Sequence, residues 1–303
     1  MKGLPDMKAF FQKIHTDDFT WMDSLITIIV ILVSLYMANS VLQSLTFYNL
    51  LDPHVPDTAL SHTAAFYFSF IVMWITYVLF CVIVTRYRFI PLSFLAEFKA
   101  KSLGKFLTGA LIGFAANGIC ILFAALHKDI ILTFDAFKLP ALLLMLAAVL
   151  VQAGAEEFAF RGFLYRCIRK GYKNPAVAIV CSSLLFSMGH LMNPGVSPLA
   201  VAGVFMGGLF FAVIVYRFDS LLAAIAAHAM WNYTQNIIFG LPNSGLVFDF
   251  SICKPDAANA ADSFFYSADF GVEGSLFSVI VLLIGSALLL FTKKGRPQKE
   301  RPL

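Results

Sequence analysis

Residues 139–164 read LPALLLMLAAVLVQAGAEEFAFRGFL, an apolar run that ends in two adjacent carboxylates, Glu156 and Glu157. A helix that crosses a bilayer needs about 20 predominantly apolar residues, so this stretch is long enough to be one. An ionisable side chain within such a helix costs free energy, and its presence there usually reflects function. The stretch therefore predicts a membrane helix that carries part of a functional site.

The rest of the chain shares this apolar character. Of its 303 residues, 59% are hydrophobic and 13% are charged, whereas soluble domains are about 25% charged. A soluble fold of this length has too little polar sequence to cover so much apolar surface. The composition excludes a soluble enzyme, a disordered chain and a nucleic-acid-binding module. The five cysteines form no C-x-x-C pair, which argues against a disulfide framework and a cysteine-based zinc site.

The predicted fold class is all-α: a polytopic membrane protein with a bundle of about eight transmembrane helices around an intramembrane polar cavity. The predicted spans are 25–48, 64–85, 106–126, 141–164, 175–192, 199–216, 220–239 and 275–292. We expect one integral membrane domain in three parts. These are N-terminal helices in 1–138, a catalytic core in 139–239, and an extracytoplasmic loop, last helix and basic tail in 240–303.

Basic residues predict the orientation. One set of alternate loops, which includes both tails, holds 19 of the 22 Lys and Arg residues, and the other set holds 3. Cytoplasmic loops carry the excess of Lys and Arg, so both termini are expected in the cytoplasm. The acidic segment 240–274 is then on the opposite side, where it lies outside the bundle or caps it.

The two carboxylates have different predicted roles. Glu157 and Arg161 are four residues apart with the acid first, the spacing of a structural ion pair within a helix. Glu156 points about 100° away around the helix and has no such partner. We therefore expect Glu157 to be structural and Glu156 to be functional.

Two histidines also lie in predicted spans. His190 follows Phe186 by four residues, and Asn232 follows His228 by four, so each pair shares a helix face. Glu156 and His190 each lie 17 residues from Lys173 in the turn between their helices, which places both about 25 Å from that turn. We expect the carboxylates, the imidazoles and the amide to meet at one level of the bundle.

This set of side chains suits the activation of water. Glu156 would take a proton from water, and His190 would share that proton or hold the water. His228 and Asn232 would donate hydrogen bonds to a developing oxyanion, with Arg161 anchoring Glu157. No placed Ser or Cys nucleophile accompanies them. The predicted reaction is hydrolysis of an amide at the membrane.

Two other mechanisms stay open at this stage. Glu156, His190 and His228 are also ligands that zinc accepts while keeping a position open for water. The H-E-x-x-H motif is absent, and residue types alone do not decide between a zinc site and an acid–base site. A serine mechanism lacks a G-x-S-x-G motif and would have to use Ser182, Ser183 or Ser187.

The three polar motifs, in this order, resemble those of the CPBP family (CAAX protease and bacteriocin-processing), typified by type II CAAX prenyl endopeptidases. The family pattern is E-E-x-x-x-R, then F-x-x-x-H, then H-x-x-x-N/D. This chain reads EEFAFR from Glu156, FSMGH from Phe186 and HAMWN from His228. Each motif alone is weak, but three in order on predicted spans are specific. The resemblance covers about residues 139–239.

The resemblance implies an eight-helix intramembrane protease with a cavity open to the cytoplasm, located in a prokaryotic inner membrane. By similarity, Glu156 and His190 activate the water, while His228 and Asn232 form the oxyanion site. The family is described both as glutamate-dependent and as metalloprotease, so Zn²⁺ at Glu156, His190 and His228 stays open. The implied partners are membrane lipid and a hydrophobic or lipidated peptide, with no nucleic acid.

Two functions of other classes compete with a protease. A non-catalytic CPBP-like membrane regulator or bacteriocin self-immunity protein would keep the fold, and its phenotype would survive Glu156→Ala and His190→Ala. A transporter or proton relay also uses paired Glu and His residues. The spans show no inverted repeat of broken helices, which argues against a transporter.

Overall fold

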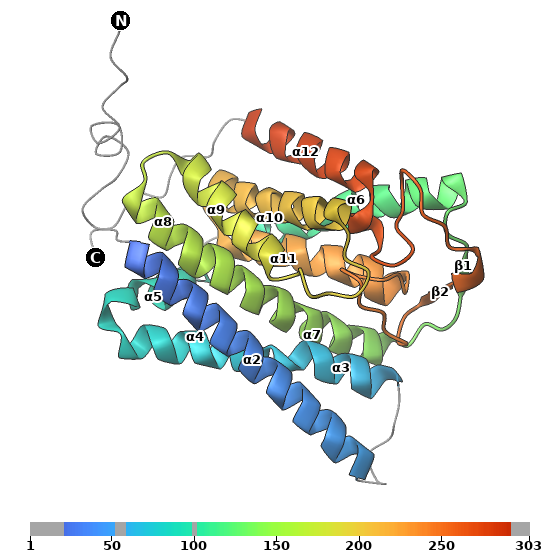
Figure 1. Cartoon of the computed structure of the whole chain (residues 1–303), viewed down its shortest axis with the longest axis horizontal. Helices are drawn as coiled ribbons and strands as arrows, with labels where there is room; N and C mark the ends of the chain where they lie inside the picture. Colours follow the sequence, from blue (N-terminus) through green and yellow to red (C-terminus); the bar gives the residue numbers. More distant parts are fainter. Residues whose placement is uncertain (1–20, 52–58, 99–101, 292–303) are drawn as a thin grey trace, which may run out of the picture.

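The computed structural model describes residues 21–51, 59–98 and 102–291, which form a bundle of packed helices (Figure 1). The basic tails that contribute to the predicted orientation lie outside these residues. The α-helices are α2 (Trp21–Leu51), α3 (Ala59–Ser69), α4 (Ile71–Ile83), α5 (Phe89–Glu97), α6 (Ser102–His127), α7 (Leu139–Glu157), α8 (Arg166–Gly171), α9 (Pro175–Met188), α10 (Pro198–Phe218), α11 (Leu221–Asn232) and α12 (Leu276–Phe291).

Two π-helical segments extend the central helices. Segment η2 (Phe158–Tyr165) joins α7 to α8, and η3 (Tyr233–Ile238) continues α11. Both begin directly after residues of the predicted site, and π-helical turns are frequent at functional sites in proteins. The short 3₁₀ turns are η1 (Thr85–Tyr87), η4 (Ala257–Asn259) and η5 (Val272–Gly274).

Each of the eight predicted spans falls on helical structure, so the chain is an all-α polytopic membrane protein. Helices α9 and α12 are shorter apolar helices. Five helical segments within the described residues are long and apolar enough to cross a membrane: Leu25–Gln43, Ala59–Ile83, Ser102–His127, Leu139–Gly171 and Pro198–Phe218.

One predicted boundary is wrong at the site itself. The apolar run predicts a helix over 175–192 that carries His190, but α9 ends at Met188. Gly189 follows as the C-cap, and Gly195 adopts a positive φ of 67° before α10 begins. His190 therefore lies in the turn between α9 and α10, while its backbone N–H still bonds to Ser187.

Helix α11 lies at the centre of the bundle, and all of its residues except Met230 are buried. Small residues let α6 approach it closely. A Cβ atom at Gly109 or Gly113 would stand 2.0 Å from the carbonyl oxygen of Ala223 or Ala227. The glycines of α6 therefore make a contact within the chain, a question that their sequence alone left open.

The segment 240–274 caps one end of the bundle, one of the two arrangements that its sequence allowed. Its strand β2 (Cys253–Pro255) pairs antiparallel with β1 (Leu132–Phe134). Figure 1 shows this pair at the end of the molecule opposite α5 and α8. The ring of Phe248 packs on Phe66 of α3, with 4.9 Å between centroids. We refer to residues 240–274 as the cap.

Helix α5 closes the other end of the bundle, where the sequence predicted only a loop. The Glu97 carboxylate accepts hydrogen bonds from the backbone N–H groups of Leu221 (2.9 Å) and Leu222 (3.3 Å) at the start of α11. It also pairs with Arg166 of α8 at 2.9 Å. An acidic side chain at a helix N-terminus is stabilising because it satisfies free N–H groups and complements the helix dipole.

Candidate active site

The predicted ion pair between Glu157 and Arg161 is confirmed. Arg161 donates to Glu157 Oε1 at 2.8 Å, and both side chains are 0% exposed. Arg161 also donates to the carbonyl oxygen of Gly208 on α10 at 2.7 Å. Its guanidinium carbon lies 4.5 Å from the ring centroid of Phe186 on α9. One buried cation thus holds α9 and α10 against α7.

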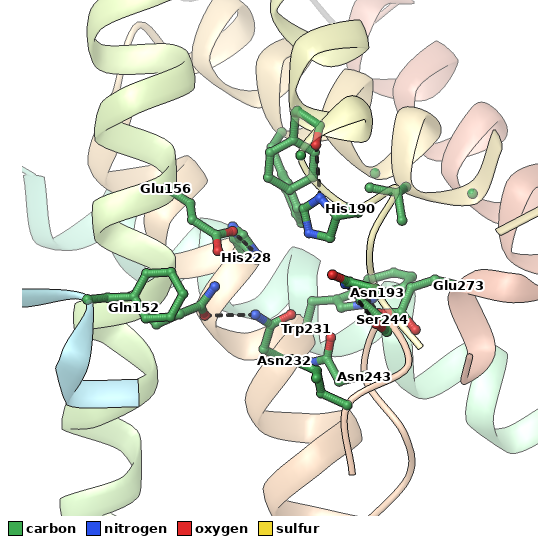
Figure 2. A pocket seen from close by; sticks show the side chains of 18 of the residues that line it. Gln152, Glu156, His190, Asn193, His228, Trp231, Asn232, Asn243, Ser244 and Glu273 are labelled. Carbon is green, nitrogen blue, oxygen red and sulfur yellow. Dashed lines mark hydrogen bonds and ion pairs between the residues drawn. The ribbon is translucent and has the colours of Figure 1, made fainter. Parts of the chain in front are cut away.

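Glu157 also orients His228. The distance from His228 Nδ1 to Glu157 Oε1 is 3.0 Å. This oxygen already accepts a hydrogen bond from Arg161 and accepts here too, so Nδ1 carries the hydrogen and donates it. The other ring nitrogen, Nε2, then lies 3.8 Å from Glu156 Oε2 (Figure 2).

His190 is oriented by the backbone. Its Nδ1 lies 2.9 Å from the carbonyl oxygen of Phe186, and because a carbonyl only accepts, Nδ1 is the donor. Its Nε2 is left as an acceptor on the cavity side of the ring (Figure 2). The ring of Phe186 lies 4.8 Å from that of His190 and 5.9 Å from that of His228, measured between centroids. Phe186 therefore separates and positions the two imidazoles.

Asn232 has a partner that the sequence analysis missed. Its Nδ2 donates to Gln152 Oε1 at 3.0 Å, and both side chains are buried. Gln152 lies one helical turn before Glu156, and this spacing within an apolar run is a signal that could have identified it. The bond uses one of the two amide hydrogens of Asn232.

Glu156, His190, His228 and Asn232 all line one cavity of about 380 Å³, together with Gln152 (Figure 2). The predicted convergence of these residues is confirmed, while Glu157 and Arg161 lie behind the wall. The Glu156 side chain is 12% exposed, and its Oε2 has no hydrogen-bond partner among the described residues. The volume is in the range of cavities that hold small ligands.

The facing wall of the cavity is polar and was not predicted. It comprises Asn193 from the turn after α9 and, from the cap, Asn243, Ser244 and Glu273. Figure 2 shows Asn193, Ser244 and Glu273 across the cavity from Glu156. These residues were missed because they lie in connecting segments, where neither helical spacing nor an apolar setting marks a polar side chain as buried.

Glu273 anchors the cap to the bundle. It accepts a hydrogen bond from Gln235 Nε2 at 2.5 Å, and Gln235 Oε1 accepts one from Asn117 Nδ2 at 2.7 Å. Ser244 Oγ lies 3.4 Å from the other carboxylate oxygen. Burial raises the pKa of Glu273 from its ordinary value to about 7, against the lowering effect of these hydrogen bonds.

The positions of these side chains bear on whether they could hold a metal ion. Ligands of one tetrahedral zinc ion lie about 3.3 Å apart, so the 3.8 Å between Glu156 and His228 is close to that spacing. In the described part of the chain, however, no three His, Cys, Asp or Glu side chains form a group that could hold a metal ion. The donor set does not fit a three-ligand site as it stands.

Comparison with known proteins points to the same part of the chain. The family model described as Type II CAAX prenyl endopeptidase Rce1-like matches residues 138–234, which include α7 through α11 and all three motifs. No curated protein and no solved structure matches the chain. The chain is therefore an all-α polytopic membrane protein in which residues 138–234, about a third of its length, are similar to type II CAAX prenyl endopeptidases of the Rce1-like kind.

Proposed function

We propose that the protein is an intramembrane endopeptidase that hydrolyses a peptide bond of a hydrophobic or lipidated membrane-associated peptide. The observation that carries the proposal is the unpartnered Glu156 Oε2, which lies 3.8 Å from His228 in a cavity of about 380 Å³. This oxygen has no hydrogen-bond partner among the described residues. Leaving a carboxylate oxygen without a partner inside a membrane bundle costs free energy. A water or substrate that it binds there offsets the cost.

Glu156 and His190 are the residues that activate water. Water held between the Glu156 carboxylate and His190 Nε2 gives its proton to Glu156, while its oxygen forms a bond to the carbonyl carbon of the peptide. The carbon–nitrogen bond then breaks, and the proton on Glu156 passes to the leaving amine. Atoms and charges balance without any further reactant.

Asn232 and His228 stabilise the oxyanion of the tetrahedral intermediate. Asn232 offers the amide hydrogen that Gln152 does not use. His228 donates from Nε2, and the Glu157 carboxylate, 3.0 Å from Nδ1, holds the ring in place. Donors that are already oriented need no rearrangement as charge develops, which is why such sites lower activation barriers. Glu157, Arg161, Phe186 and Gln152 act through these groups as positioning residues.

The orientation and location belong to the same proposal. The excess of Lys and Arg on one set of loops supports a protein with both termini in the cytoplasm. The location proposed is a prokaryotic inner membrane. The partners are membrane lipid and the peptide substrate, and whether zinc takes part is decided by adding a chelator to the cleavage assay.

The experiment that tests this function is a comparison of membrane peptides in cells that express wild type, Glu156→Gln or Asp249→Asn. Asp249 is an exposed acidic residue of the cap and serves as the matched control. We expect at least one uncleaved membrane peptide to accumulate with Glu156→Gln and not with Asp249→Asn. A phenotype that survives both Glu156→Ala and His190→Ala would contradict the proposal and assign a regulatory or immunity role.

A further inference from the structure

The connecting segments at one end of the bundle form the rim of the cavity. The turn between α9 and α10 supplies Met192, Asn193 and Pro194, and the cap supplies Leu246 and Phe248. Met192 is 93% exposed while it also lines the cavity, so it stands at the mouth. Figure 1 shows the cap at the end away from α5 and α8.

The other end of the bundle is closed. Glu97 of α5 caps α11 and pairs with Arg166 of α8, which ties three helices together beneath the cavity. No residue of α5 or α8 lines the cavity. The turn at Lys173 lies 17 residues along the chain from both Glu156 and His190. A peptide that approached from that end would meet a packed helix terminus.

Charge distinguishes the two ends. The closed end carries most of the basic residues that the structure describes: Arg88, Lys105, Arg166, Arg169, Lys170, Lys173 and Arg217. The cap end carries only Lys128, Lys138 and Lys254 among many acidic residues, which are Asp129, Asp135, Asp249, Asp256, Asp262, Asp269 and Glu273. Short loops that are rich in Lys and Arg stay in the cytoplasm. The closed end therefore faces the cytoplasm.

We infer that the cavity opens on the extracytoplasmic surface of the membrane and receives its peptide from that side. This opening is opposite to the cytoplasmic one that the family resemblance implies. The part of the inference that concerns peptides rests on the proposed function, whereas the direction of opening rests on the rim, the closed end and the charges alone.

The residues that line the cavity indicate which class of substrate such an opening would admit. Apolar and aromatic side chains from α2, α3 and the residue between α3 and α4 make one side of the cavity, which suits an apolar segment: Leu35, Phe66, Tyr67 and Phe70. Asn243 is 8% exposed, and its Nδ2 has no hydrogen-bond partner among the described residues. That free donor fits a main-chain carbonyl. The substrate class is a membrane-anchored peptide whose scissile bond lies near the extracytoplasmic surface.

Cysteine labelling in oriented vesicles tests the direction of opening. Met192→Cys at the mouth and Lys173→Cys at the exposed basic turn are each placed in a chain without its five natural cysteines. A membrane-impermeant maleimide is added to sealed right-side-out or inverted vesicles. We expect Met192→Cys to be labelled only in right-side-out vesicles and Lys173→Cys only in inverted ones. The reverse pattern, or equal labelling of Met192→Cys in both, would overturn the inference.

Two controls keep the result independent of folding and of activity. In wild type, peptide mapping of the label at Cys253 of the cap reports the same side without any substitution and should agree with Met192→Cys. Adding Glu156→Gln should leave the labelling pattern unchanged. A reversed pattern with cleavage intact contradicts only the direction of opening, whereas the expected pattern without any cleavage contradicts only the peptidase.

Discussion

At the scale of single residues, two adjacent glutamates have opposite surroundings. Glu157 is fully buried and accepts hydrogen bonds from Arg161 and His228 at one oxygen, while Glu156 faces the cavity. Each carboxylate has a second oxygen without a hydrogen-bond partner among the described residues. The difference follows from the helix, which turns about 100° between them. One carboxylate can therefore organise the site while its neighbour performs chemistry.

The first prediction concerns the buried cation. Arg161→Ala leaves Glu157 charged and unpaired in the core, and breaking a buried pair in this way costs about 3–5 kcal/mol of unfolding free energy. Thermal unfolding of the purified protein in detergent measures the loss. Lys173→Ala, at an exposed position, should leave the midpoint unchanged. Equal midpoints for the two variants would show that the pair does not hold the bundle together.

The second prediction concerns the oxyanion site. Asn232→Ala removes one donor, and loss of such a donor lowers kcat by about 10²–10³-fold. KM should change little, because the bond is made to the transition state. Asn259→Ala, an exposed asparagine of the cap, is the control and should retain wild-type kcat. A rise in KM without a fall in kcat would assign Asn232 to substrate binding instead.

The positions of the candidate-site residues follow the sequence pattern closely, with clear exceptions. Glu156, His190, His228 and Asn232 could be found because a charged or polar side chain is conspicuous in an apolar span. Asn243 and Glu273 could not, because a polar residue in a connecting segment looks ordinary until the cap folds over the cavity. Their burial depends on contacts with distant helices, which local sequence does not encode.

At the scale of helices, close approach of backbones positions the site. Gly113 on α6 lies against Ala227 of α11, the residue just before His228. On the same helix, a Cβ atom at Gly118 would meet no described atom within 4 Å. The two glycines have different surroundings in one helix, so a methyl group added at each should have opposite effects on stability.

The third prediction uses that contrast. Gly113→Ala places a Cβ atom 2.0 Å from the Ala227 carbonyl oxygen, so the helices must separate. We expect a lower unfolding midpoint and lower activity, since His228 moves with α11. Gly118→Ala meets nothing and gains helix propensity worth up to about 1 kcal/mol. Equal effects of the two substitutions would contradict the packing of α6 on α11.

The fourth prediction concerns the cap and pH. Because burial raises the pKa of Glu273 from 4.5 to about 7, the folded protein retains a proton that the unfolded chain releases between these values. The free energy of unfolding should therefore fall as pH rises across that window. The loss amounts to about 3 kcal/mol at most, since one pKa unit corresponds to about 1.4 kcal/mol.

Unfolding midpoints in detergent between about pH 3.5 and pH 8, which extends about one unit beyond the window on each side, check this. Glu273→Gln keeps the shape of the side chain and should flatten the profile, while Asp249→Asn should leave it as in wild type. A profile that is unchanged by Glu273→Gln would show that another group titrates there.

The helices themselves were largely predictable, since each spanning segment is a long apolar run. Helix α5 and the β1–β2 pair were not, because long-range partners stabilise them. Glu97 can cap α11 only once α5 and α11 are adjacent. Strand β1 has no partner until β2 of the cap packs beside it. The end of α9 was missed because the apolar run continues beyond Gly189 into Leu191 and Met192.

At the scale of the whole molecule, the cavity is formed by segments from different parts of the chain. The family match ends at residue 234 and contains the four side chains of the candidate site, whereas the facing wall comes largely from the cap and one side comes from α2 and α3. The proposed chemistry thus lies within residues 138–234, and much of the surface that a substrate would contact lies outside them. Changes in the cap should alter which peptide is cleaved more than how it is cleaved.

The central claim is that Glu156 is the base of a peptidase. Its most direct test is cleavage of quenched-fluorescent membrane peptides, with and without a prenyl group, by purified protein in lipid. Wild type and Glu156→Ala are compared, each with and without a zinc chelator. We expect cleavage by wild type alone, with both proteins unfolding at similar temperatures, and the chelator decides whether a metal takes part. Cleavage by Glu156→Ala at the wild-type rate would contradict the claim.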